Sequence, residues 1–270
     1  MKFGIYPGGR AATVCSHPPD PAAIGDLVDD LAGGNAFVVR EYVHFFGDAT
    51  PPDVVTSLGA DDELAHLTMP DEWYVQAGRE LDLVVSYIPQ AADLSGWLAF
   101  LDTVIDRYGH LTRYLQVTLE PNFPIPLIDG SAPGVLEALT LGIPHARTAL
   151  DRRGLHNVRI GFSVAEPPEW LGGDDGFRQY LSAVPQQDFA DHVDYVGLGL
   201  YPDAFSPVAL SDMINSILAL CKPLNITHYE LFSLRDADSG STEPSGTLGI
   251  VSDTYRPKPA FTLYRDLVRR

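Results

Sequence analysis

Cysteine and basic residues are both scarce in this chain of 270 residues. Only Cys15 and Cys221 occur, far apart in sequence and with no metal-ligand spacing around either. A disulfide framework is therefore excluded, and two plain thiols are typical of a reducing compartment. The chain has 18 Lys and Arg against 36 Asp and Glu, for a formal net charge of −18. Such a chain repels phosphate backbones and anionic lipid surfaces, so we expect neither nucleic acid nor a membrane as a partner.

Long apolar runs and leader-like segments are missing as well. No apolar run approaches the roughly 18 residues that span a bilayer. Met1 and Lys2 lead directly into a short apolar run, without the apolar stretch of about 7–15 residues and the cleavage site of a secretory signal. We therefore expect a cytoplasmic protein. No cluster of His, Cys, Asp or Glu has the spacing of metal ligands, so we expect neither a metal nor another cofactor.

Short apolar runs alternate with amphipathic stretches along the chain, and 45% of its residues are hydrophobic, as in folded globular proteins. The apolar runs predict strands over residues 3–7, 35–46, 81–88, 113–119, 158–165, 193–201 and 224–234. The amphipathic stretches predict helices over residues 21–32, 70–80, 93–108, 133–153, 175–183, 209–220 and 259–269, and residues 246–251 form a short extension. Strands that are apolar almost throughout and alternate with helices indicate a parallel sheet buried on both faces.

The helix expected over residues 21–32 carries clear signals at both of its ends. Asp20 is a favourable N-cap, and Pro21 suits the first helical position. Gly33 and Gly34 follow the last apolar residue of the periodic pattern. Because glycine readily adopts the left-handed conformation that closes a helix, we expect the helix to end there.

No linker rich in Gly, Ser or Pro divides the chain, so we expect residues 1–270 to form one domain. A doubly wound open sheet usually carries a G-x-G-x-x-G loop after its first strand, and Pro7-Gly8-Gly9-Arg10 does not match that motif. Walker A, H-E-x-x-H and G-x-S-x-G motifs are missing too. We therefore predict an α/β fold of the TIM type, a (β/α)8-like barrel.

Glu120 is the sharpest candidate for chemistry. In such barrels the active site lies at the carboxyl ends of the strands, and Glu120 follows the expected fourth strand. Pro121 cannot donate to a neighbouring strand and turns the chain outward, which aims the carboxylate into the barrel mouth. A carboxyl group against apolar walls tends to have a raised pKa, as a general acid requires. The other reading is a loop cap or a partner of an arginine.

Other polar residues near the expected strand ends would converge on one acidic, aromatic pocket. Arg40 lies inside an apolar strand and requires a buried partner carboxylate. Histidines without a ligand pair are more often hydrogen-bonded structural residues than metal ligands, and a tyrosine at a strand end also suits core packing. The candidates are Tyr6, Arg40, His44, Tyr87, Asn122, Glu166, Tyr201, Asp203, His228 and Glu230, with Asp236 beyond them.

Three of these features resemble the clan A glycoside hydrolases, which are (β/α)8 barrels with two catalytic glutamates. They are Glu120-Pro121-Asn122, Arg40, and the Gly-Leu-Gly-Leu-Tyr-Pro segment at residues 197–202. Residues 227–239 and 248–261 are similar to the last strand and final helix of uncharacterised actinobacterial members of that clan. The resemblance implies that Glu120 is the acid/base, that Arg40 orients the nucleophile and that Tyr201 contacts it.

The chain departs from that clan in two places. Leu119 stands where the clan usually has an asparagine that contacts the sugar 2-hydroxyl. No Thr-Glu-x-Gly-like motif supplies the strand-seven nucleophile. Between Tyr201 and Asn225 there is room for one loop and one helix, whereas a full βα unit takes roughly 30 residues. We therefore expect a barrel that is incomplete or irregular around residues 202–224. Glu230 is a substitute nucleophile if it points inward.

Three functions remain open. In the first reading, the chain is a repurposed barrel enzyme in which Glu120 alone serves as general acid/base. Its reaction would be cyclisation, elimination or isomerisation of a small non-sugar or modified-sugar substrate. Alternatively, it is a retaining glycosidase, which needs two carboxyl groups about 5–5.5 Å apart, such as those of Glu120 and Glu230. The third reading is a ligand-binding relative without catalysis. The sequence does not specify an oligomeric state.

Overall fold

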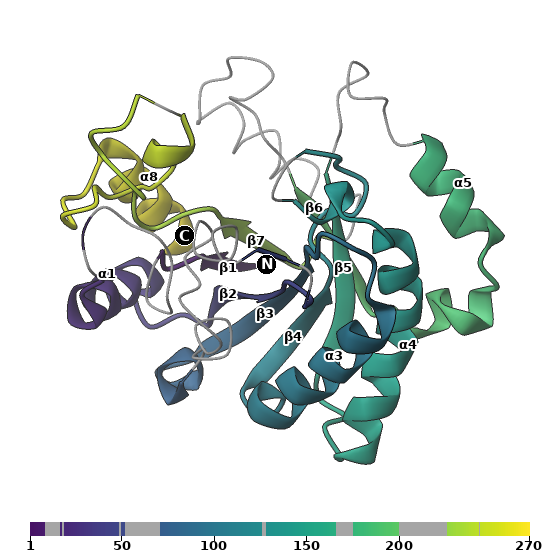
Figure 1. Ribbon diagram of the computed structural model, residues 1–270. Helices are drawn as coiled ribbons and strands as arrows, with labels where there is room; N and C mark the ends of the chain where they lie inside the picture. Colours follow the sequence, from purple (N-terminus) through teal and green to yellow (C-terminus); the bar gives the residue numbers. More distant parts are fainter. Residues whose placement is uncertain are drawn as a thin grey trace.

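A computed structural model of the chain describes residues 1–8, 17, 19–48, 50–51, 71–125, 128–165, 175–199, 226–242 and 244–270. Seven parallel strands form one sheet in the order β6-β5-β4-β3-β2-β1-β7 (Figure 1). The strands are β1 (Lys2–Ile5), β2 (Phe37–Phe45), β3 (Arg79–Tyr87), β4 (Thr112–Val117), β5 (Arg159–Ala165), β6 (Tyr195–Gly199) and β7 (His228–Leu231). The predicted α/β fold with a parallel sheet is therefore confirmed.

The sheet is curled, so that its two edge strands face each other across a shared interior. The Tyr195 ring on β6 lies 6.2 Å from the His228 ring on β7, measured between ring centroids. The Tyr195 hydroxyl also donates to Asp82 on β3 at 3.4 Å. Within the described residues the sheet is a TIM-like barrel that stays open between β6 and β7. The helix predicted over residues 209–220 lies outside the described residues.

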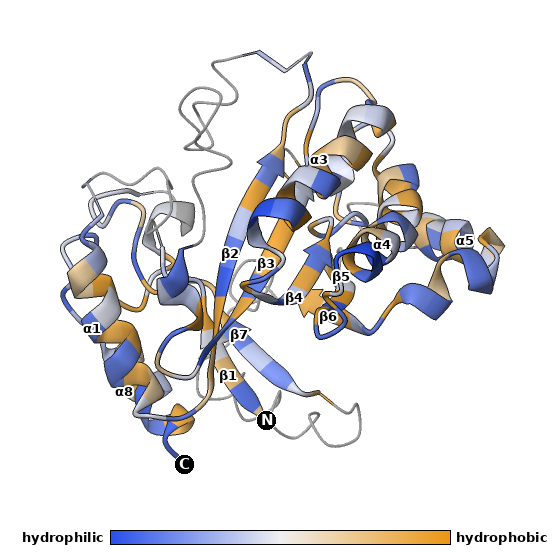
Figure 2. Cartoon of the chain, turned by 90° about the horizontal axis from the view of Figure 1, so that it is seen from below, coloured by the Kyte–Doolittle hydropathy of each residue, from blue (hydrophilic) through white to orange (hydrophobic). Residues whose placement is uncertain are grey.

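Helices cover the outer face of the curled sheet. They are α1 (Pro21–Ala32), α3 (Leu94–Tyr108), α4 (Val135–Arg152), α5 (Asp175–Ala183) and α8 (Pro259–Val268), with 3-10 turns at η2 (Glu72–Val75), η3 (Asp129–Ser131), η5 (Gln186–Asp188), η6 (Ala190–His192) and η7 (Pro244–Thr247). The first and last helices, α1 and α8, lie side by side, and α3 and α4 pack against each other farther around the same outer face (Figures 1 and 2). Among the described helices, none combines the length and apolar character that crossing a bilayer would require.

The local signals at α1 act as the sequence predicts. The Asp20 carboxylate accepts hydrogen bonds from the backbone N–H groups of Ala22 and Ala23 at 3.0 and 3.1 Å. Pro21 occupies the first helical position, and Gly33 ends the helix with φ 57°, in the left-handed region that glycine adopts most readily. These caps fix both helix ends without help from distant residues.

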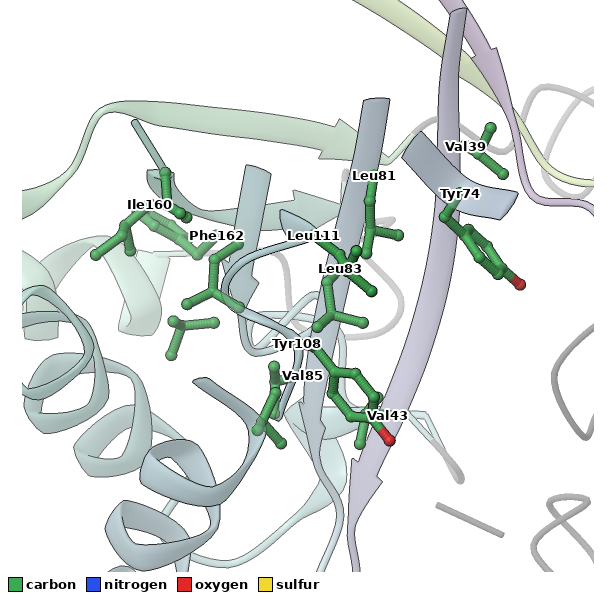
Figure 3. Packing of buried hydrophobic residues seen from close by; sticks show 14 of the residues in the cluster. Val39, Val43, Tyr74, Leu81, Leu83, Val85, Tyr108, Leu111, Ile160 and Phe162 are labelled. Atoms are coloured by element: carbon green, nitrogen blue, oxygen red, sulfur yellow. The ribbon is translucent and has the colours of Figure 1, made fainter. Parts of the chain in front are cut away.

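Side chains of β2, β3 and β4 alternate between two buried layers. Val43, Leu83 and Val85 point toward the helices and join an apolar core in which each is fully buried (Figure 3). The residues between them, such as Arg40, Asp82 and Gln116, point into the barrel interior, where they contact one another. This alternation follows from the period of two in a strand. It gathers most of the buried apolar side chains on the outer face and these polar side chains in the interior, although Glu41 is buried on the outer face and Val84 in the interior.

Two of the expected elements take another form. The helix predicted over residues 70–80 is wrong, because the described part holds only the 3-10 turn η2 and then enters β3 at Arg79. Gly78, with φ 80°, makes the turn into that strand. Residues 246–251 overlap η7 and end in an isolated bridge between Arg235 and Val251 rather than a strand.

Candidate active site

Glu120 sits on an unusual backbone just beyond the carboxyl end of β4. Thr118 and Glu120 both have positive φ values, of 69° and 49°. Left-handed backbone is uncommon for residues other than glycine, and it persists where the surroundings enforce it, often at functional sites. The Glu120 N–H donates to the Ser163 hydroxyl of β5 at 3.1 Å, and the residue is 4% exposed. The loop is therefore fixed in place with the glutamate buried.

Asp129 holds the backbone on the other side of this loop. Its carboxylate accepts the N–H of Leu119 at 2.8 Å and the N–H of Tyr87 at 2.7 Å, and the Ser86 hydroxyl donates to it as well. Burial raises the pKa of Asp129 to about 7, although these three donors favour the ionised form. Asp129 therefore ties the ends of β3 and β4 together directly beside Glu120.

The carboxylate of Glu120 lies against Gly199 at the end of β6. A Cβ atom at position 199 would overlap Oε1 of Glu120, so a side chain there would displace the carboxylate. The negative charge of Glu120 also contributes to raising the pKa values of Tyr42 and Asp129. The glutamate therefore lies inside the barrel mouth, close to β2, β5 and β6.

Below this level the barrel holds an interior cluster, defined here as Arg40, Asp82, Gln116, Tyr195 and Glu230. The Arg40 guanidinium lies 3.4 Å from Asp82 and 3.5 Å from Glu230, and it donates to the Gln116 amide oxygen at 2.8 Å. The exposed fractions of the Arg40, Asp82 and Glu230 side chains are 18%, 3% and 12%. Arg40 thus has the partner that its place in an apolar strand requires, and two carboxyl groups serve as partners.

Two carboxyl groups around one guanidinium change the titration of this cluster. Burial, followed by the neighbouring charge of Glu230, raises the pKa of Asp82 to about 8, against the opposing effect of Arg40. A hydrogen bond between the Asp82 and Glu230 side chains favours the protonated Asp82 further. Burial and a second carboxyl group at close range therefore hold Asp82 largely in its protonated form near neutral pH.

Gln116 connects the interior cluster to the loop that carries Glu120. Its amide nitrogen donates to the Thr118 carbonyl and to the Ser163 hydroxyl, both at 3.0 Å. Its amide oxygen accepts from Arg40, and Ser163 in turn accepts the Glu120 N–H. A continuous set of hydrogen bonds therefore runs from Glu230 through Arg40, Gln116 and Ser163 to the backbone of Glu120.

Aromatic rings gather at the mouth next to these polar groups. Tyr6 on β1 stacks on Phe232 with 5.1 Å between ring centroids, and it meets Tyr42 edge-on at 5.1 Å. Tyr42 stacks on His44 at 6.4 Å. Phe232 is 52% exposed, whereas Tyr6 is 5% exposed. Tyr42 and His44 are half-buried, so the Phe232 ring is the most exposed of the four.

Five of the candidate residues from the sequence share this interior. Glu120 and the aromatic residues Tyr6 and His44 lie at the mouth, and Arg40 and Glu230 lie in the interior cluster. Glu230 points inward, the orientation that the sequence left open. Glu166, Tyr201 and Asp203 lie outside the described residues.

Tyr87 and Asn122 hold structure together instead of lining the mouth. Tyr87 is fully buried on the outer face, where it packs against Phe45 and Trp97 and accepts the Asp93 N–H. The last residue of β3 therefore faces the helices rather than the interior. Asn122 exchanges two hydrogen bonds with the backbone of Ala165, at 2.8 and 3.0 Å, and so fastens the Glu120 loop to the end of β5.

His228 and Asp236 also lie apart from Glu120. His228 begins β7 and packs on Tyr114 at 4.5 Å between ring centroids, at the amino end of the barrel. Burial lowers the pKa of His228, which makes it a neutral structural histidine. Asp236 accepts from Ser239, Gly249 and Lys258, and thereby closes the loops before α8.

Sequence reasoning missed Asp82, Gln116, Ser163, Asp129 and Phe232. The first three had a readable signal, because a polar side chain inside an otherwise apolar strand must face a polar interior. Asp129 and Phe232 depend on contacts with distant elements. In the part of the chain that the structure describes, no group of three or more His, Cys, Asp or Glu side chains is arranged to hold a metal ion.

The comparisons with known proteins agree on the fold. No family model and no curated protein sequence matches the chain. The solved structure of the exo-beta-1,4-mannosidase Op5Man5 from Opitutaceae bacterium strain TAV5 matches with a TM-score of 0.62 at 13% identity, over 100% of this chain and 59% of that one. CJP38, a beta-1,3-glucanase and allergen of Cryptomeria japonica pollen, matches with a TM-score of 0.56 at 15% identity, over 96% and 98% of the two chains.

A third solved structure, the endo-1,4-beta-xylanase XylE of Penicillium canescens, matches with a TM-score of 0.53 at 14% identity, over 89% and 96% of the two chains. Identities this low show the fold alone. The chain therefore shares the β/α-barrel fold of these three structures, in agreement with the fold predicted from the sequence.

Proposed function

We propose that this chain is an enzyme that binds a small sugar-like substrate at the barrel mouth and uses Glu120 as its general acid/base. The observation that supports the proposal is the fixed, buried position of Glu120. A buried glutamate on left-handed backbone, with its own N–H bonded to Ser163 and the preceding N–H bonded to Asp129, has a defined position before any substrate arrives. Such preorganisation is what proton transfer at a fixed site needs.

Two buried polar atoms near this position support a binding role. Nε of Arg40 and the hydroxyl of Thr118 have no hydrogen-bond partner within the described chain. A buried polar group without a partner costs about 1–3 kcal/mol, so such groups are retained where a ligand can satisfy them. Hydroxyl groups of a sugar-like substrate are suitable partners. The exposed Phe232 face, backed by Tyr6, suits stacking against the apolar face of a sugar ring.

The reaction class that we favour needs proton transfer without a covalent nucleophile, such as cyclisation, elimination or isomerisation. Glu230 lies 3.5 Å from the Arg40 guanidinium and is hydrogen-bonded to Asp82, so its carboxyl oxygens already have partners. Leu119 supplies no polar contact beside Glu120. Under this proposal Glu120 moves the proton, and the interior cluster keeps the loop in position through Gln116.

A retaining glycosidase is the second candidate, favoured by one observation. Glu230 faces inward next to Arg40, on a strand across the barrel from β4, as a substitute nucleophile must. The two candidates differ in whether a covalent glycosyl-enzyme forms. A 2-deoxy-2-fluoro aryl glycoside traps that intermediate, and a mass increase on the peptide that contains Glu230 would select the glycosidase.

The test of the proposed function begins with a screen of the purified protein against aryl glycosides and against sugars with an eliminable or isomerisable centre. On the substrate found, Glu120→Gln keeps the shape and removes the titrating group, so kcat falls about 10²–10⁴-fold while the fold is retained. The exposed Glu137→Gln on α4 is the matched control and leaves kcat unchanged. Wild-type turnover by folded Glu120→Gln would refute the proposal.

A further inference from the structure

A polar recess lies at the opposite end of the barrel from Glu120. It has a volume of about 250 Å³ and is lined by Arg113, Arg147, His156, Asn157, Arg159 and Asp194. We call it the arginine recess. Arg113 and Arg159 stand at the amino-terminal ends of β4 and β5. Arg113 lies near the start of β4 and Glu120 lies beyond its end, so the length of the strand separates the two sites by roughly 15–20 Å.

The arginine recess has a local excess of positive charge on a strongly acidic chain. Its three guanidinium groups face a single lining carboxylate, that of Asp194. Arg147 and Arg159 both pair with Asp194, whereas Arg113 donates to the backbone carbonyl of Asn157 at 2.7 Å and pairs with no carboxylate in the described chain. Two formal positive charges therefore remain, although the chain carries −18 overall.

The recess is built in advance and does not rely on mobile side chains alone. The Asp194 carboxylate accepts the N–H of Ile160 at 2.8 Å, and it holds Arg147, which also donates to the His192 carbonyl at 3.4 Å. Burial would raise the pKa of Asp194, but the Ile160 N–H and Arg147 lower it overall, so it stays ionised. Arg147 is thus fixed on one side, with the 58% exposed Arg159 at the rim.

We propose that the arginine recess binds a small anion that carries a phosphate group. Guanidinium groups match phosphate oxygens in a bidentate geometry and bind them by charge-assisted hydrogen bonds. The volume suits a phosphate group with a small attached moiety, since sites for drug-sized ligands run from about 300 to 1,000 Å³. Free phosphate and a phosphorylated metabolite share this chemistry. The site is independent of Glu120 and goes beyond the proposed function.

Isothermal titration of the full chain with inorganic phosphate, at constant ionic strength adjusted with chloride, tests this directly. We expect one site per chain. Arg113→Gln leaves the pairs of Asp194 intact, and it weakens phosphate binding about tenfold or more, as does Arg159→Gln. Arg152→Gln is the matched control, because Arg152 is 59% exposed, pairs with Asp102 and lies outside the recess. It leaves the affinity unchanged.

A second titration with a hexose phosphate and the corresponding free hexose identifies the source of the phosphate. Tighter binding of the hexose phosphate than of inorganic phosphate indicates a phosphorylated metabolite, and equal affinities indicate free phosphate. No phosphate binding by the wild type, or equal weakening by Arg152→Gln and Arg113→Gln, would overturn the proposal and leave the recess as a surface ion-pair cluster. Circular dichroism of each variant checks the fold, and Glu120 activity has no bearing on the result.

Discussion

The two faces of the central strands are both buried, yet they consist of opposite chemistry. On the outer face of β2 and β3, Val43, Leu83 and Val85 pack against helices and are fully buried. On the inner face, the Arg40 guanidinium lies 3.4 Å from the Asp82 carboxyl group, and their side chains are 18% and 3% exposed. TIM barrels commonly fill this interior with branched apolar residues. Here the interior beside β2, β3 and β4 also holds polar and charged side chains, among them Arg40, Asp82 and Gln116.

The difference between the faces also decides how each responds to change. Apolar burial is non-directional and stabilises by about 25 cal/mol per Å² whichever neighbour is present. The charges inside offset their own desolvation only while every partner stays in place. We expect these interior groups to position the loop of Glu120, because Arg40 donates to Gln116 and Gln116 donates to Thr118 and Ser163.

Replacing Arg40 should cause the largest loss of stability of any change on the inner face. Arg40→Met leaves the Asp82 and Glu230 carboxyls facing each other without a cation, and we expect the free energy of unfolding to fall by about 3–5 kcal/mol. Urea denaturation measures this. Adding Glu230→Leu to Arg40→Met removes one of the stranded charges and should recover part of the loss. Equal stability of Arg40→Met and wild type would mean that the interior charges are hydrated and independent.

Leu83→Ala tests the outer face of the adjacent strand. It removes a fully buried side chain from the apolar core, and we expect a loss of about 2–5 kcal/mol in the free energy of unfolding (Figure 3). Because Leu83 points away from the interior, the turnover of the folded variant per molecule should match that of wild type. A large drop in kcat for folded Leu83→Ala would show that the two faces are not separable.

Asp82→Asn should change how stability depends on pH, with the smallest effect at acidic pH. The raised pKa of about 8 means that native Asp82 holds its proton where the unfolded side chain loses it. Its contribution is thus fully present below about pH 4 and is lost as the pH rises toward 8. Asp82→Asn keeps a donor to Glu230 and removes this loss.

The measurement is thermal denaturation of wild type and Asp82→Asn from pH 5 to pH 9. The Tm of Asp82→Asn should gain on that of wild type as the pH rises. The exposed Asp188→Asn serves as the control and should run parallel to wild type. A constant difference between Asp82→Asn and wild type across this range would contradict the raised pKa of Asp82.

Local signals in the sequence were sufficient for much of the fold. α1 begins and ends where Asp20, Pro21 and Gly33 predict, because caps and a first-turn proline act within a few residues. The conformation of residues 70–80 is instead decided by contacts with distant residues. Their amphipathic pattern suggests a helix, but the Arg79 side chain packs over the Trp73 ring at 4.4 Å and pairs with Asp29 of α1, which places Arg79 in a strand.

A site residue could be predicted only where the sequence indicates both which end of a strand it occupies and which face of the sheet its side chain points to. Glu120 follows a well-defined strand and lies at the mouth, as expected. Tyr87 was expected in the pocket but faces the helices, because adjacent residues of a strand point to opposite sides of the sheet. Its neighbour Ser86 points the other way and donates to Asp129 beside the Glu120 loop. His228 lies at the beginning of β7, a position hidden by the longer apolar run around it. The inward direction of Glu230 required the contact with Arg40.

Chemical rescue of Glu120→Ala tests the central claim most directly, on the substrate identified by the screen. We predict that kcat falls about 10²–10⁴-fold and that added formate restores a saturable part of it, since formate can occupy the space that the carboxylate leaves beside Gly199. Glu137→Ala should show neither the loss nor the response. Wild-type turnover by Glu120→Ala, or a loss that formate does not restore in a folded protein, would contradict the role of Glu120 in proton transfer.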